Sequence, residues 1–64
     1  MKRNKLIRHL EKNGCYLLRE GSSHSLYFNP FNSAISTVPR HSDVKKFTAQ
    51  KICKDLSIDI PAEN

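Results

Sequence analysis

The sequence predicts a single small α+β domain in the order α-β-β-β-α, with a three-stranded antiparallel sheet and two helices on one of its faces. Amphipathic segments lie towards both ends of the chain, and three strand-like runs separated by turn residues lie between them. A chain of 64 residues, of which 38% are hydrophobic, has room for one core only. We therefore expect one domain over residues 1–64, with 57–64 as a loose tail.

The first predicted helix covers residues 4–13. Asn4 is a suitable cap for its start, because asparagine side chains accept hydrogen bonds from the first free amides of a helix. Gly14 stands where a helix stops. The apolar residues of this segment fall on one face: Leu6, Ile7 and Leu10.

Three short strands are predicted next, at residues 15–20, 25–29 and 34–38. Glycine, serine, asparagine and proline separate the runs, and these residues favour turns. Successive side chains of a strand point to opposite faces of the sheet. In the second strand, Leu26 and Phe28 therefore point to one face and Tyr27 to the other. Three strands in series predict an antiparallel sheet with one face left more exposed than the other.

A polar connection over 39–47 leads to the second predicted helix, at 48–56. Thr48 is the expected cap, and Phe47 before it is expected to pack on Ile52 as a hydrophobic staple. The expected buried face of this helix consists of Ala49, Ile52, Cys53 and Leu56.

The charge distribution favours a polyanionic partner. Eleven basic residues against six acidic ones give a net charge of +5, and residues 21–39 contain no Asp, Glu, Lys or Arg. A neutral middle between basic ends can fold into a polar surface ringed by cations, which suits nucleic acid. The alternative is an ordinary solvated surface, and the choice stays open in particular for the basic residues of the first helix, Lys2, Arg3, Lys5 and Arg8.

Several classes of protein are not expected. No apolar run reaches the length of a membrane span or of a secretory signal, so we expect a cytoplasmic protein. Cys15 and Cys53 lie in apolar contexts and are expected to be buried thiols in a reducing compartment. No pair of Cys or His has the spacing of zinc ligands, so we expect neither a metal nor another cofactor.

One motif points to a family. The turn Gly21-Ser22-x-His24 precedes the second strand, and Val38-Pro39-Arg40-His41 follows the third. Together with the first helix ending in Asn13-Gly14 and with the second helix, these pieces resemble the HicA family over residues 4 to about 58. HicA proteins are small mRNA endonuclease toxins of bacterial toxin–antitoxin pairs.

The resemblance implies a fold similar to a double-stranded-RNA-binding domain, metal-independent cleavage of mRNA and His24 as the catalytic residue. It also implies a HicB-type antitoxin that covers the active face, while the toxin itself reads no DNA. The chain departs from the family in one place. Many members have Gly-Ser-His-His, whereas Ser23 stands here at the position of the first histidine.

The residues themselves suit RNA cleavage. Histidines ordinarily titrate near pH 6.5, so His24 can accept or donate a proton near neutral pH. Amides and hydroxyls of Gly21, Ser22 and Ser23 are expected to hold a phosphate, and Arg40, Lys45 and Lys46 to stabilise the charge that develops on it. Tyr27, if exposed, can stack on a base, and sheet packing is the equal alternative.

Two further assignments stay open. His41 orders the 39–47 connection or contacts a phosphate more readily than it transfers a proton. For the whole chain, the main alternative is a non-catalytic RNA-binding module of the double-stranded-RNA-binding type, which would read A-form shape with the same basic rim. A weaker alternative is a module that only binds an acidic protein. The expected RNA contacts are Gly21, Ser22, Ser23, Tyr27, Arg40, His41, Lys45 and Lys46.

Overall fold

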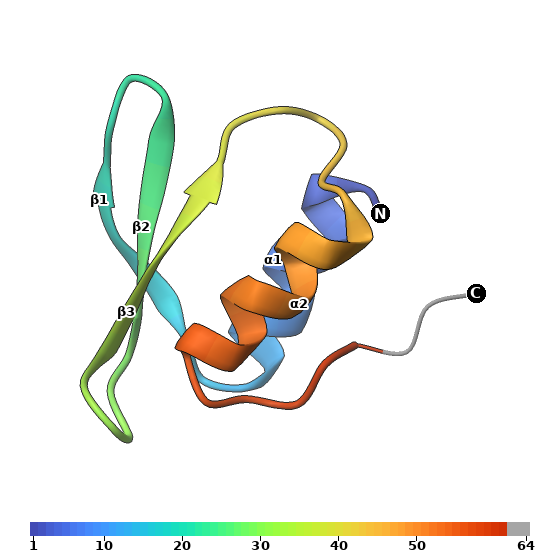
Figure 1. Cartoon of the computed structure of the whole chain (residues 1–64). Coiled ribbons are helices and arrows are strands. Elements are labelled where there is room, and N and C mark those ends of the chain that lie inside the picture. The colour runs from blue at the N-terminus through green and yellow to red at the C-terminus, as the bar shows by residue number, and fades with distance from the viewer. Residues whose placement is uncertain (62–64) are drawn as a thin grey trace.

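The computed structural model, which describes residues 1–61, confirms the predicted architecture (Figure 1). Two helices lie side by side against one face of a three-stranded sheet, and the opposite face of the sheet is bare. The elements, in chain order, are α1 (Arg3–Lys12), β1 (Tyr16–Glu20), β2 (His24–Asn29), β3 (Ala34–Pro39) and α2 (Lys46–Asp55).

The sheet has the order β1-β2-β3, and both pairs of neighbouring strands are antiparallel. β2 pairs with β3 without interruption, from His24 opposite Pro39 to Asn29 opposite Ala34. The β1–β2 ladder contains an irregularity between Leu17 and Arg19. Directly paired residues point to the same face of a sheet, so the register decides which side chains lie together.

The core lies between the sheet and the helices. Each helix turns an apolar face inwards, and β2 and β3 contribute Tyr27 and Val38. The fully or almost fully buried helix residues are Leu6, Leu10, Ala49, Ile52 and Cys53. The predicted buried faces of both helices are thereby confirmed.

Polar side chains at the end of β2 and in the turn after it tie the sheet to the C-terminus of α2. Asn29 Nδ2 and Asn32 Nδ2 both donate to the carbonyl oxygen of Leu56, at 2.9 and 3.1 Å. Carbonyls at the end of a helix have no partner within the helix, so these two bonds satisfy the C-terminus of α2. This polar role explains why β2 turns Ser25 and Asn29 inwards, while Leu26 and Phe28 point to the bare face.

Both helices begin earlier than predicted. α1 starts at Arg3 after Lys2, and α2 starts at Lys46 after Lys45, in both cases without a side-chain cap. The capping roles expected of Asn4 and Thr48 are therefore wrong. The start of α2 follows Val44, which is buried and whose amide donates to the carbonyl of Met1 at 2.8 Å. A long-range contact thus anchors the segment just before this helix, and no side-chain cap is present at its start.

Three other sequence expectations have different outcomes. Phe47 is 77% exposed, so the expected staple on Ile52 is wrong. Cys15 and Cys53 are buried free thiols as predicted, and burial raises the pKa of both. Within residues 1–61, no helix is long and apolar enough to span a membrane.

The expected tail over 57–64 is described as far as Pro61. In this part Ile58 packs against the core. Near it, Nε2 of His9 lies 2.6 Å from the carbonyl oxygen of Asp59. Residues 62–64 lie outside the described part of the chain.

Candidate active site

The turn at residues 21–24 joins β1 to β2 and carries His24 at its end. The Gly21 amide donates to the carbonyl oxygen of His24 at 2.8 Å and closes the turn. A Cβ at position 21 would lie 2.8 Å from that same oxygen, so the close approach of the two backbones requires glycine. The His24 side chain is exposed and lies where β2 begins, so the turn presents an imidazole to solvent.

A shallow hollow surrounds this imidazole. Two residues outside the turn contribute to it: Arg19, from β1, and Leu26, from β2. These two are paired across the ladder and therefore share a face. The complete lining of this His24 hollow is Arg19, Gly21, Ser22, Ser23, His24 and Leu26. An anion entering the hollow would meet hydroxyls, a guanidinium and an imidazole.

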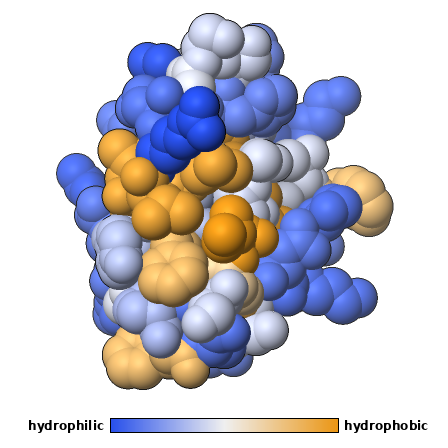
Figure 2. Space-filling view, turned by 90° about the vertical axis from the view of Figure 1, so that its left-hand side faces the viewer, coloured by the Kyte–Doolittle hydropathy of each residue, from blue (hydrophilic) through white to orange (hydrophobic). Residues whose placement is uncertain are grey.

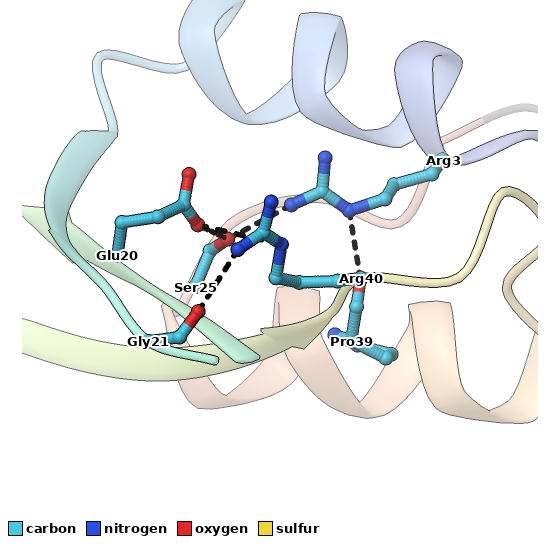
Figure 3. A network of polar contacts seen from close by, with 6 residues as sticks. All are labelled: Arg3, Glu20, Gly21, Ser25, Pro39 and Arg40. Carbon is cyan, nitrogen blue, oxygen red and sulfur yellow. Dashed lines mark hydrogen bonds and ion pairs between the residues drawn. The ribbon is translucent and has the colours of Figure 1, made fainter. Parts of the chain in front are cut away.

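A network of polar contacts holds the 21–24 turn in place (Figure 3). Arg40 Nη1 donates to the carbonyl oxygen of Gly21 at 3.0 Å, and Arg40 Nε lies 3.9 Å from the carboxylate of Glu20. Ser25 Oγ donates to the same Glu20 carboxylate. The residue after β3 is thus joined to the β1–β2 turn, which limits the freedom of the segment that carries the imidazole.

Arg3 extends this network to the first helix. Its Nη2 donates to Ser25 Oγ at 2.9 Å, and its Nε donates to the carbonyl oxygen of Pro39 at 2.7 Å. Two guanidinium groups, from Arg3 and Arg40, therefore converge on the single carboxylate of Glu20 and on Ser25 (Figure 3). The local charge balance is positive by one, which favours an anionic ligand nearby.

A second hollow, which we call the basic hollow, lies between the start of α1 and the segment after β3. Five of the seven residues that line it are cationic, and Arg40 links it to the 21–24 turn. Its lining residues are Lys2, Arg3, Asn4, Lys5, Arg8, Arg40 and Ser42. Lys2 forms a surface ion pair with Asp43 at 3.4 Å, which offsets part of this charge.

The structure brings some predicted site residues together and leaves others apart. Gly21, Ser22, Ser23 and His24 line one hollow, and Arg40 contacts their turn. Three other predicted RNA contacts, His41, Lys45 and Lys46, are exposed but line neither the His24 hollow nor the basic hollow. The cations that line a hollow together with Arg40 come instead from the first eight residues of the chain, which are distant in sequence.

Tyr27 is not available for stacking. Its side chain is 6% exposed and packs in the core, so the expectation of an exposed Tyr27 is wrong. Burial raises the pKa of its phenol, and the positive charge of Arg3 partly opposes that rise. Tyr27 is paired with Ser36, and both side chains face the helices.

Sequence reasoning missed the supporting residues Arg3, Glu20 and Ser25, because their contacts join segments far apart in the chain. Arg19 could have been found, since alternation around a tight turn places it on the face of the sheet that also carries His24. Among residues 1–61, no group of three or more His, Cys, Asp or Glu side chains is placed to hold a metal ion.

Comparison with protein families matches residues 3–58 to the family described as HicA toxin of bacterial toxin-antitoxin. The chain belongs to the HicA toxin family. The match covers most of the 64 residues, including both helices, the sheet and the 21–24 turn, and it confirms the resemblance seen in the sequence. Membership of the HicA family supports a toxin function as part of a toxin–antitoxin pair. No curated protein and no solved structure matches the chain.

Proposed function

We propose that this HicA-family chain is a metal-independent endoribonuclease that cleaves mRNA with His24 as its catalytic residue. The observation that carries the proposal is the arrangement at the 21–24 turn: an exposed imidazole lies in a carboxylate-free hollow, on a turn that Arg40 joins to a cluster of cations. A phosphodiester backbone needs cations along its path and a proton-transfer group at the scissile phosphate. Family membership supports the same activity.

The chemistry needs one base and one nucleophile, and RNA supplies the nucleophile. In this proposal the His24 imidazole accepts the proton of the 2′-hydroxyl, whose oxygen attacks the adjacent phosphorus. The bond from phosphorus to the 5′-oxygen breaks, and that oxygen takes a proton from water or from the imidazolium. The products are a 2′,3′-cyclic phosphate and a free 5′-hydroxyl. Both Arg19 and Ser22 line the hollow; the Arg19 guanidinium is suited to offset the charge of the phosphorane, and the Ser22 hydroxyl to donate a hydrogen bond to it.

The carboxylates of the chain favour a mechanism without metal. Mg²⁺ sites in nucleases are built from several convergent carboxylates. Glu20 is the only acid between residues 16 and 39, and its carboxylate already accepts from Ser25 and faces Arg40. The residues that line the His24 hollow include no acid.

The experiment that tests the proposal is cleavage of a labelled single-stranded mRNA in EDTA. We expect cleavage by the wild-type chain and a loss of about 10²–10⁴ in rate for His24→Ala, the usual effect of removing a general base. His41→Ala serves as the matched control, because His41 is exposed but lies outside both hollows. A substrate with a 2′-deoxyribose at the scissile nucleotide should bind and stay intact. Cleavage of that substrate, or activity that returns only with Mg²⁺, would contradict the mechanism.

A non-catalytic RNA-binding module is the second candidate, and the basic hollow favours it, because cations along a helix also suit the backbone of a duplex. The same assay separates the two, since a binding module would protect RNA and leave it intact. The proposal includes a cytoplasmic location and a HicB-type antitoxin as partner, in line with the toxin–antitoxin family.

A further inference from the structure

The bare face of the sheet, which we call the open face, has a polar end and an apolar end. Strand pairing arranges its side chains in three rows across the sheet. His24 and Pro39 form the row at the 21–24 turn, followed by a row of Arg19, Leu26 and Thr37. The row at the far end consists of Tyr16, Phe28 and Ile35. Figure 2 looks onto this face and shows apolar side chains gathered over it.

The far row contains a pair of aromatic rings. Tyr16 and Phe28 contact each other edge to face, with ring centroids 5.6 Å apart and planes inclined by 67°. Tyr16 is 48% exposed and Phe28 is partly exposed, although aromatic rings on a sheet face are ordinarily covered by packing. Ile35, which is paired with Phe28, is 51% exposed and extends the same surface.

The charges of the open face suit a polyanion. Glu20 is the only acid in the sheet, and it turns to the other side, where it accepts from Ser25. The open face carries Arg19 and His24 at its polar end, and both line the His24 hollow. A ligand on this face would therefore meet aromatic rings at one end, cationic and proton-transfer groups at the other, and no carboxylate between them.

We propose that the open face is a stacking platform for the bases of single-stranded RNA, which extends from Tyr16 and Phe28 to the scissile phosphate at His24. The proposal rests on the proposed function, because it takes His24 as the site of cleavage. From His24 to Phe28 the strand rises by about 13 Å. Four-stranded sheets that bind single-stranded RNA stack two or three bases on exposed aromatic rings. Tyr27, for which stacking and packing were equal alternatives, packs in the core, and in this proposal the two rings on the opposite face do the stacking.

RNA fits this face better than a protein segment does. The apolar row is continuous with the His24 hollow, so any ligand that lies along β2 reaches the imidazole. Its anchors are aromatic, and an aromatic face binds any base by stacking. Arg19 stands in the row between the rings and His24, where its guanidinium is suited to bind the phosphate of a stacked nucleotide.

Binding of a fluorescently labelled, single-stranded oligonucleotide built wholly of 2′-deoxyribose tests the platform, because such a strand cannot be cut through a 2′-hydroxyl. We expect Tyr16→Leu and Phe28→Leu each to weaken binding roughly 5- to 150-fold, the range of one lost base stack. Tyr16→Phe keeps the ring and should bind within about twofold of wild type. Phe47→Leu is the matched control, because Phe47 is a more exposed ring away from the sheet and should have no effect.

A second measurement separates stacking from folding. A 2-aminopurine base in the oligonucleotide should lose fluorescence on binding to the wild-type chain and to Tyr16→Phe, but not to Tyr16→Leu. Unfolding temperatures close to wild type would show that the leucine variants keep their fold. Wild-type affinity in both leucine variants would overturn the platform. So would an equal loss in Phe47→Leu, or a wild-type self-association that the leucine variants abolish, which would assign the face to a second copy.

The two proposals fail in different ways. If the oligonucleotide binds through Tyr16 and Phe28 but His24→Ala cleaves RNA as fast as wild type, the platform stands and the catalytic assignment falls. If His24→Ala abolishes cleavage while both leucine variants keep their affinity, the assignment stands and the platform falls.

Discussion

The open face and the basic hollow meet at the 21–24 turn but are built in opposite ways. The open face is largely apolar, with the rings of Tyr16 and Phe28 at one end and few charges. The basic hollow is lined mainly by cations, which come from Lys2, from α1 and from the segment after β3. Arg40 lines the basic hollow and donates a hydrogen bond to the Gly21 carbonyl oxygen, so this one residue links the two regions.

Under the proposed function, this difference would let a chain of 64 residues bind a long polymer at two kinds of surface. Contacts to phosphates supply affinity that falls as salt rises, whereas stacked bases supply affinity that depends little on salt. An RNA strand that crosses the end of the sheet would place its bases on one side of the turn and its backbone on the other. The scissile phosphate would then lie at the crossing point, beside His24.

Among the variants that leave His24 in place, Gly21→Ala should have the largest effect on cleavage, because it disturbs the point where the two regions meet. The added Cβ would lie 2.8 Å from the carbonyl oxygen of His24, so the turn must move. Displacement of a catalytic group by about 1 Å can cost about 10²-fold in rate. We expect a loss of this order in RNA cleavage, while affinity for the 2′-deoxy oligonucleotide changes little. Wild-type cleavage by this variant would show that the geometry of the turn is not critical.

Arg40→Lys tests the link between the regions. Lysine keeps the charge beside the basic hollow but lacks the planar fork with which Arg40 contacts both Gly21 and Glu20. We expect cleavage to fall about tenfold, the order of one charge-assisted hydrogen bond, with an unchanged salt dependence of binding. Arg40→Ala should lower both the cleavage rate and the salt dependence of binding. If Arg40→Lys and Arg40→Ala lowered the cleavage rate and the salt dependence of binding by the same amounts, Arg40 would act only as a phosphate contact.

The salt dependence of RNA binding distinguishes the basic hollow from the cations that the sequence favoured. Lys5 and Arg8 line the hollow with Arg40, whereas Lys45 and Lys46 lie outside it. Each lost phosphate contact on a single strand reduces the slope of log K against log salt by about 0.7. We therefore expect a slope shallower by about 1.4 for Lys5→Ala with Arg8→Ala, and by less than half of that for Lys45→Ala with Lys46→Ala. A larger change in slope for the Lys45 and Lys46 variant than for the Lys5 and Arg8 variant would show that the RNA backbone binds at the start of α2.

The smallest expected effect is on the ionisation of Tyr27, on the inner face of the sheet. In Tyr16→Phe, Tyr27 is the only tyrosine left, so the absorbance of the phenolate reports on it alone. Burial raises the pKa of Tyr27 above its ordinary value of 10.0. A group with a raised folded pKa stabilises the fold fully below the unfolded pKa and loses that contribution as the pH rises through the folded one. The midpoint of Tyr27 ionisation should therefore lie above the ordinary value of 10.0, and ionisation should accompany loss of stability. Titration at the ordinary value would place the phenol in solvent.

The element order follows from the sequence because its causes are local. The apolar spacing of Leu6 and Leu10, the turn residues around Gly21 and the alternation along β2 each act over a few residues, and all the predicted elements are present. The position of His24 at the mouth of a strand follows from the same local rules. These rules explain why the fold class and the turn with its imidazole were predictable.

The choice of inner and outer face was decided only in the tertiary structure. The alternation of side chains along β2 shows which residues share a face of the sheet. It does not show which of the two faces the helices cover. The structure turns Ser25, Tyr27 and Asn29 inwards, because Ser25 binds Arg3 and Glu20 and Asn29 caps the end of α2. That choice leaves Phe28 on the open face beside Tyr16.

The grouping of the cations was decided in the same way. Arg40 meets Lys5 and Arg8 in one hollow only because α1 packs beside the segment that follows β3. By itself, the sequence determined where each element lies and that His24 opens a strand. Packing of distant segments decided which side chains surround that histidine, because long-range contacts leave no periodic pattern in the chain.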